Sequence, residues 1–99
     1  MARQVIWTQR AQDERIKILT FWIAHNKSIT YSKNLNGLIK SSLILISKYP
    51  FLGKATQKQN VRVKILSNYL IIYEITATKI IILSIWDSRQ KPRDINKVL

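Results

Sequence analysis

Basic and aromatic side chains are interspersed with apolar ones between residues 61 and 93, and these are residue types that bind nucleic acid. The cations considered there are Arg62, Lys64, Arg89, Lys91 and Arg93, and the aromatic residues are Tyr69, Tyr73 and Trp86. Cations that contact phosphates make binding salt-dependent, and rings stack on unpaired bases for about 1–3 kcal/mol per base. Aromatic pairs also stabilise sheets by packing across strands, so both roles stay open for the rings.

Three short strands are predicted to carry these residues. Val61, Val63 and Ile65 alternate with basic residues, which is the period of a half-buried strand. Residues 69–75 and 80–86 are rich in β-branched and aromatic residues and form two further apolar runs of strand length. A two-residue loop at Ser67 and Asn68 would join the first two strands as a hairpin.

The hairpin loops predict which residues face each other. The first loop places Leu66 opposite Tyr69, Lys64 opposite Ile71 and Arg62 opposite Tyr73. An even-length second loop places Tyr73 opposite Ile82 and Tyr69 opposite Trp86. Side chains alternate sides along a strand. One face would then carry Arg62, Lys64, Tyr69, Tyr73 and Trp86 and stay open, while the core face would carry Val61, Val63, Ile65, Leu70, Ile72, Leu83 and Ile85.

The first half of the chain predicts a strand and two helices. Residues 3–7 are short and apolar at the centre, and Thr8 is a candidate N-cap for a helix that runs to about residue 24. A second helix begins after a cap at Ser28 or Thr30 and ends before Pro50. The order is β-α-α-β-β-β, an α+β fold in which a two-helix hairpin packs on a mostly antiparallel twisted sheet. Residues 1–99 form one domain.

Composition narrows the possible partners. The net charge of +12 predicts attraction to polyanions, with nucleic acid first and an acidic protein second. The chain has no cysteine and one histidine, so we expect no metal site and no cofactor. No signal peptide and no apolar run of membrane-spanning length is found, which predicts a cytoplasmic protein without membrane contact.

An ordered set of segments resembles the RelE/ParE superfamily of type II toxins. The set comprises Trp7 with Ala11, residues 49–54 (YPFLGK), residues 61–63, residues 69–75 and residues 82–89. The resemblance covers nearly the whole chain. It implies a cognate antitoxin that wraps the toxin in a hetero-oligomer. It implies one of two activities: RelE-like members cleave mRNA on the ribosome, and ParE-like members poison DNA gyrase.

The resemblance also implies site residues. Arg62 and Lys64 match the basic pair on the first hairpin strand of RelE-like nucleases, and Arg89 matches the arginine after the last strand. Such an enzyme needs proton transfer and positive charge at the phosphorane. We therefore expect Arg62 and Arg89 to hold the scissile phosphate and Lys64 to add charge or move a proton, unless Arg62 and Lys64 are ordinary solvated strand residues.

The sequence differs from the RelE-like nucleases at two positions, and these differences count against nuclease activity. Leu70 stands where the nucleases carry a further arginine, and Asp87 stands where some carry a histidine. Asp87 itself either ends the strand, pairs with an arginine or acts as a catalytic carboxylate. The leading prediction is a ribosome-dependent mRNA endoribonuclease. The alternative is a ParE-type gyrase inhibitor without nuclease activity, and a third class is a basic RNA-binding domain that is not toxic.

Overall fold

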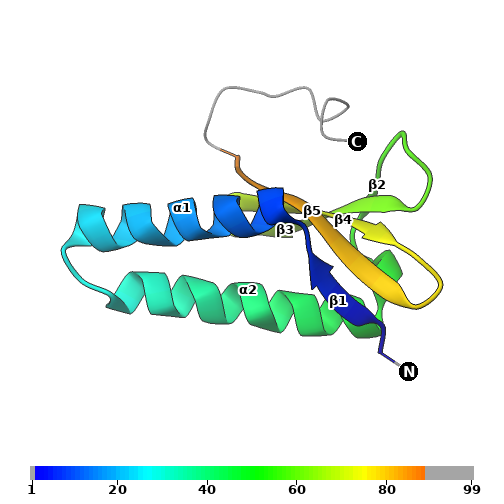
Figure 1. The fold of residues 1–99 in the computed structure, drawn as a ribbon, viewed down its shortest axis with the longest axis horizontal. Helices are drawn as coiled ribbons and strands as arrows, with labels where there is room; N and C mark the ends of the chain where they lie inside the picture. The colour runs from blue at the N-terminus through cyan, green and yellow to red at the C-terminus, as the bar shows by residue number, and fades with distance from the viewer. Residues whose placement is uncertain (1, 89–99) are drawn as a thin grey trace.

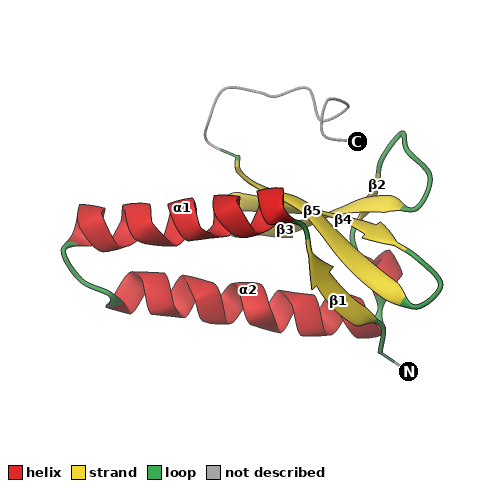
Figure 2. Cartoon of the chain, in the orientation of Figure 1, coloured by secondary structure: helices red, strands yellow, loops and turns green. Residues whose placement is uncertain are grey.

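The computed structural model describes residues 2–88 and shows two helices packed against one face of a mixed sheet (Figures 1 and 2). The elements are β1 (Gln4–Trp7), α1 (Gln9–Asn26), α2 (Thr30–Lys48), the 3₁₀ helix η1 (Pro50–Leu52), β2 (Lys54–Ala55), β3 (Val61–Leu66), β4 (Tyr69–Ile75) and β5 (Lys79–Asp87). The strand order is β1-β5-β4-β3-β2, with β1 parallel to β5 and the other neighbours antiparallel. The predicted α+β fold is confirmed, and the short strand β2 was not anticipated.

Local sequence signals explain both ends of the first helix. The Thr8 hydroxyl accepts a hydrogen bond from Ala11 N at 3.1 Å and so caps α1, as predicted. The same hydroxyl donates to the Ile82 carbonyl at 2.8 Å, which ties the start of α1 to β5. The helix ends at Asn26, because Lys27 has a φ of 51° and turns the chain through the left-handed region.

The second helix begins differently from the prediction. Its N-cap is Ile29, which makes no side-chain capping bond. The prediction of a cap at Ser28 or Thr30 is therefore wrong. The Ser28 hydroxyl instead accepts from Thr30 N at 3.2 Å and stabilises the turn between the helices. Pro50 follows the last helical turn as expected and begins η1.

The main core lies between the helices and the sheet. It joins Ala11 of α1 and four apolar residues of α2 to buried residues of β4 and β5. The members on the two strands are Tyr69, Ile71, Tyr73, Ile75, Ile80, Ile82 and Ile85. A smaller cluster of Val61, Val63, Ile72 and Trp86, with Leu70 and Leu83 packed on it, lies apart from this core. Side chains of neighbouring residues alternate sides of a strand, so this second cluster occupies the sheet face away from the helices.

Strand pairing confirms the first hairpin and corrects the second. Leu66 faces Tyr69, Lys64 faces Ile71 and Arg62 faces Tyr73, as predicted. Tyr73 also faces Ile82 as predicted, but Tyr69 faces Asp87 and not Trp86. The cause is an irregularity between Ile72 and Tyr73, which shifts the pairing of β4 with β5 by one residue.

The expected assignment of the two sheet faces is wrong. The face that carries Tyr69 and Tyr73 is the one the helices cover, and Tyr73 is fully buried there. The predicted core residues Val61, Val63, Leu70, Ile72 and Leu83 lie on the other face, together with Trp86, while Ile85 is the one that does enter the main core. Both faces are apolar, so hydrophobic alternation did not distinguish them. No described helix is long and apolar enough to cross a lipid bilayer.

Candidate functional site

Arg62 is held against the turn that follows α2. Its Nη1 donates to the Gly53 carbonyl at 2.8 Å and to the Phe51 carbonyl at 3.2 Å. Its guanidinium carbon lies 5.0 Å from the centroid of the Phe51 ring, which is a cation–π geometry. Two backbone carbonyls thus accept from Nη1 of Arg62, and the Phe51 ring lies against its guanidinium. This arrangement anchors η1 to β3.

Tyr73 of β4 also holds the turn that follows α2. Its buried hydroxyl donates to the Pro50 carbonyl at 2.6 Å and accepts from Gly53 N at 3.0 Å. Burial raises the pKa of Tyr73 above its ordinary value of 10.0, although the Gly53 hydrogen bond and the Arg62 charge lower it. The ring is fully buried, so it cannot stack on a base in this conformation.

Gly53 is required by close packing at this junction. A Cβ at this position would lie 2.5 Å from the Tyr73 hydroxyl and 2.9 Å from the Val63 carbonyl oxygen. Sequence analysis singled out residues 49–54 as a segment that resembles the toxin superfamily but missed that Phe51 and Gly53 are the partners of Arg62. The signal was present in the residue type, because glycine is the residue without a Cβ and it directly follows the turn that begins at buried Pro50.

Tyr69 is also part of the core. Its hydroxyl accepts a hydrogen bond from Trp22 Nε1 at 2.6 Å, and its exposed fraction is 3%. It therefore ties α1 to the start of β4. The predicted open face that would present Tyr69 and Tyr73 to bases does not exist, because α1 and α2 cover it.

The sheet face away from the helices, called the open face below because no helix covers it, is apolar. Its cluster residues are nevertheless at most 9% exposed, whereas Ile65 is 48% exposed. Trp86 lies there, with an exposed fraction of 7%, packed with Val61, Val63 and Ile72. Beside this cluster is a hollow of about 560 Å³ between the edge of the sheet and the loop after β2. It is lined by Lys54, Ala55, Thr56, Gln57, Val63, Ile65 and Leu70. Apart from Lys54 at its rim, the lining offers apolar and neutral side chains.

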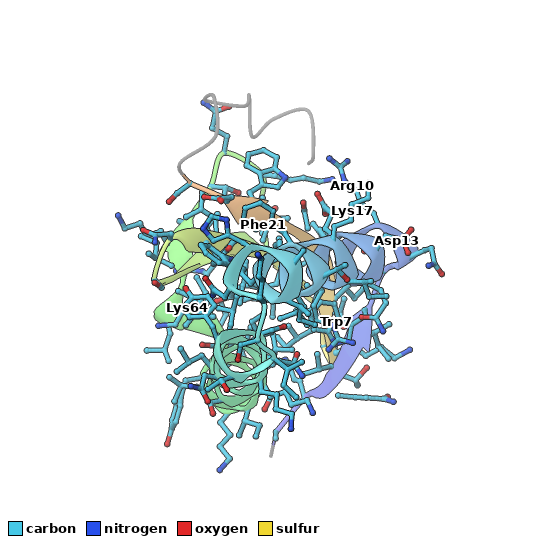
Figure 3. All side chains as sticks on the ribbon, turned by 90° about the vertical axis from the view of Figure 1, so that its left-hand side faces the viewer. Trp7, Arg10, Asp13, Lys17, Phe21 and Lys64 are labelled. Atoms are coloured by element: carbon cyan, nitrogen blue, oxygen red, sulfur yellow. The ribbon has the colours of Figure 1, made fainter. Side chains whose placement is uncertain are left out.

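The other predicted residues are divided between the described and the undescribed parts of the chain. Lys64 is half-buried on the helix side of β3, and Figure 3 shows it on the opposite side of the helical pair from Trp7. Asp87 ends β5 beside a small hollow that Lys17, Phe21 and Tyr69 also line. Arg89, Lys91 and Arg93 lie outside the described residues. Within residues 2–88, no group of three His, Cys, Asp or Glu side chains is placed to hold a metal ion.

Several solved structures share this fold. A chromosomal ParDE toxin–antitoxin system from P. aeruginosa aligns over 85% of this chain and 94% of its own, with 15% identity and a TM-score of 0.71. The toxin–antitoxin complex RelBE2 from Mycobacterium tuberculosis aligns over 86% and 96%, with 17% identity and a TM-score of 0.61. A variant of the E. coli toxin RelE in the free state aligns over 99% and 90%, with 15% identity and a TM-score of 0.66. At these identities the likeness is one of fold.

The sequence itself identifies the family. No curated protein sequence matches the chain. Residues 5–92 match the family model of the ParE toxin of the type II toxin–antitoxin system parDE. This match takes in every strand and helix described above except the first residue of β1. The chain therefore belongs to the ParE toxin family of type II toxin–antitoxin systems.

Proposed function

We propose that this toxin stops growth by binding and inhibiting DNA gyrase in the cytoplasm, and that it does not cut RNA. The observation that carries the proposal is the largely apolar lining of the hollow on the open face, where Ile65 is 48% exposed. Exposed apolar side chains that lie together on a surface are suited to protein contacts. A phosphate that reacts needs positive charge near the developing phosphorane, and the lining of this hollow offers Val63, Ile65 and Leu70, with Lys54 as the single cation among the described residues there. The match to ParE toxins favours the same target.

The engagement of Arg62 adds support. Both of its hydrogen bonds to backbone carbonyls come from Nη1, and its guanidinium also lies over Phe51, so turning the whole side chain toward a scissile phosphate would break these contacts. One of these bonds is exposed and the other part-buried, so losing them costs less than the ~1–3 kcal/mol of a fully buried carbonyl left without a donor. The catalytic roles of Arg62, Lys64 and Arg89 stay predictions, and the ParE-type activity requires none of them to act on RNA.

A second candidate is the ribosome-dependent mRNA endoribonuclease. Two observations favour it: the net charge of +12 and the shared fold with RelE and RelBE2. In that case Arg89, Lys91 and Arg93 would supply the phosphate contacts, together with Lys64 of β3.

An antitoxin is the second expected partner. Two of the solved neighbours were determined as toxin–antitoxin systems or complexes. The strong positive charge of this chain suits an acidic antitoxin through charge complementarity. We propose a hetero-oligomer in which that antitoxin keeps the toxin inactive.

Brief induction of the toxin in growing cells separates the two activities. We expect growth arrest with DNA breaks and a DNA-damage response, while mRNA stays intact. Cut mRNA with intact DNA would overturn the gyrase proposal in favour of the nuclease. Undisturbed growth would contradict both.

A matched pair of variants tests whether the open face binds the target. Ile65→Glu places a charge on that face at a side chain that is 48% exposed, and we expect it to abolish arrest. Ile44→Glu, on α2 and 59% exposed, is the control and should leave arrest unchanged. Circular dichroism of both purified variants checks that each keeps the fold. Equal toxicity of the two would rule out the open face as the contact surface.

A further inference from the structure

The outer edge of β3 is covered by β2 along only part of its length. Backbone groups of an antiparallel strand point alternately to its two sides. The Asn60 carbonyl, just before β3, accepts from Ile75 N at 2.7 Å, on the β4 side. The next carbonyl, that of Val61, accepts from the Thr56 hydroxyl at 2.9 Å, on the β2 side. The backbone groups of every second residue of β3 from Val61 onward therefore point away from β4.

Ile65 is the outward-pointing residue of β3 that lies past the end of β2. β2 begins at Lys54, which faces Val63, and the chain before it turns away as η1. The N–H and the carbonyl of Ile65 point outward by the same alternation, and among residues 2–88 neither group has a hydrogen-bond partner. Unpaired backbone groups at a sheet edge are a template for a further strand. This edge therefore suits an occupant with an extended backbone.

The hollow on the open face lies beside these unpaired groups. Ile65 and Leu70 face each other across the β3–β4 hairpin, and both line the hollow together with Val63. Ile65 is 48% exposed, so its apolar surface is accessible to a partner. Side chains of an added strand alternate between the two faces of the sheet. One of them would therefore lie over the hollow, which at about 560 Å³ has room for an apolar side chain.

Charge indicates which kind of chain would pair here. The stretch of residues 53–70, which forms this edge and the hollow, contains four cations and no acidic residue. The cations are Lys54, Lys58, Arg62 and Lys64. A second copy of this chain would bring the same cations against them, and residues 89–99 contain four cations and one acidic residue. Like charges across an interface are unfavourable, so these charges favour an acidic segment of another protein.

We infer that an extended acidic segment of gyrase adds to the sheet at the edge of β3, pairs its backbone with Ile65 and places an apolar side chain in the hollow. This inference rests on the gyrase activity proposed above and names the element that holds gyrase. In strand addition, backbone hydrogen bonds supply affinity and pockets for alternate side chains supply specificity. Figure 1 shows β2 and the loop after it at the opposite end of the molecule from the turn between α1 and α2, so this site is remote from that turn.

Inhibition of supercoiling by purified gyrase tests the backbone pairing. Ile65→Pro removes the outward N–H, whereas Ile65→Val keeps it, and the two new side chains are similar in size. Proline is tolerated in edge strands where the missing N–H would face outward. We expect Ile65→Pro to need about tenfold more toxin than Ile65→Val for half inhibition, as for the loss of one hydrogen bond at an interface. Urea unfolding of both variants checks that each keeps the fold.

Two further substitutions test the charge and the hollow. Lys54→Glu reverses the cation at the rim and should weaken inhibition by about tenfold, because it repels an acidic segment. Lys79→Glu is the matched control and should inhibit as the wild type does, because Lys79 is also exposed but pairs with β1 at the opposite edge of the sheet. Ala55→Leu fills part of the hollow and should also weaken inhibition. All three altered side chains are exposed, so the fold should be kept.

The contrary outcomes separate this inference from the proposed function. Equal inhibition by Ile65→Pro and Ile65→Val, or equal losses at Lys54 and Lys79, would overturn strand addition and leave gyrase inhibition standing. A lack of inhibition by the wild-type toxin would refute the gyrase activity itself, and with it the occupant named here. If Ile65→Pro inhibits as strongly as Ile65→Val but is no longer neutralised by the antitoxin, the edge binds the antitoxin and the inference is wrong.

Discussion

Gly53 provides the sharpest test of the junction that anchors the end of α2. In Gly53→Ala, the new methyl group would lie 2.5 Å from the Tyr73 hydroxyl and 2.9 Å from the Val63 carbonyl oxygen. The hydroxyl is held by two hydrogen bonds and the carbonyl is backbone, so neither moves freely. Overpacking of this kind costs about 1–3 kcal/mol. The gain from a less flexible unfolded chain is only about 0.4–1 kcal/mol, so we expect net destabilisation.

Thermal and urea unfolding measure the effect. For a chain of this size, each kcal/mol lowers Tm by about 4–8 °C. Gly37→Ala is the matched control, because nothing lies within 4 Å of the added methyl group and the site is in the middle of α2. That substitution should stabilise by up to about 1 kcal/mol through helix propensity. Unchanged or increased stability of Gly53→Ala would refute the packing argument.

A double-mutant cycle tests whether the clash with the Tyr73 hydroxyl causes the destabilisation by Gly53→Ala. Tyr73→Phe removes the hydroxyl and leaves the buried Pro50 carbonyl and Gly53 N–H without that partner, which costs about 1–3 kcal/mol. Because the closest clash disappears with the hydroxyl, Gly53→Ala should cost less in this background than in the wild type. Additive effects would show that the clash with Tyr73 does not govern the site.

Three further predictions concern the same scaffold. Burial raises the pKa of Tyr73 in the folded state, so the tyrosine ionises first in the unfolded chain and the free energy of unfolding should fall as pH rises above about 10. Urea titrations should show a shallower fall for Tyr73→Phe. Equal slopes for the two proteins would refute this pH dependence. Thr8→Ala should lower stability by about 0.5–2 kcal/mol through loss of the cap of α1, which calorimetry can measure. Trp22→Phe should cost about 0.5–1.5 kcal/mol through loss of the bond to Tyr69, and a neutral result would show that bond to be unimportant.

The order of elements was predictable because it rests on strong local signals. Thr8, Pro50 and the turn at Ser67 and Asn68 each restrict the backbone in a way that the sequence displays. Ser67 adopts a φ of 55°, which suits a tight hairpin. From these signals the pairing of the first hairpin was predicted correctly, including Arg62 opposite Tyr73.

The faces of the sheet were not predictable from local signals. Both faces of β4 are apolar, and the shift in pairing between Ile72 and Tyr73 has no clear mark in the sequence. The charges of Arg62 and Lys64 suggested an open face, yet β3 lies near the sheet edge, where long side chains reach past the helices. Tyr73 lies on the central strand and has no such route, so it is buried.

The same error explains the predicted site. The aromatic residues were assigned to bases because they shared a face with the cations, and that assignment required the face to be open. Instead Tyr73 and Arg62 together bind the turn at residues 50–53. Long-range contacts of this kind are set by the packing of α2 on the sheet, which no local pattern records.

An assay with purified components tests the central claim most directly. The toxin is incubated in parallel with DNA gyrase on relaxed plasmid and with mRNA-programmed ribosomes, and supercoiling and mRNA length are followed. We predict inhibition of supercoiling with intact mRNA, as expected for an apolar sheet face that binds protein. Cleaved mRNA with normal supercoiling would contradict the account.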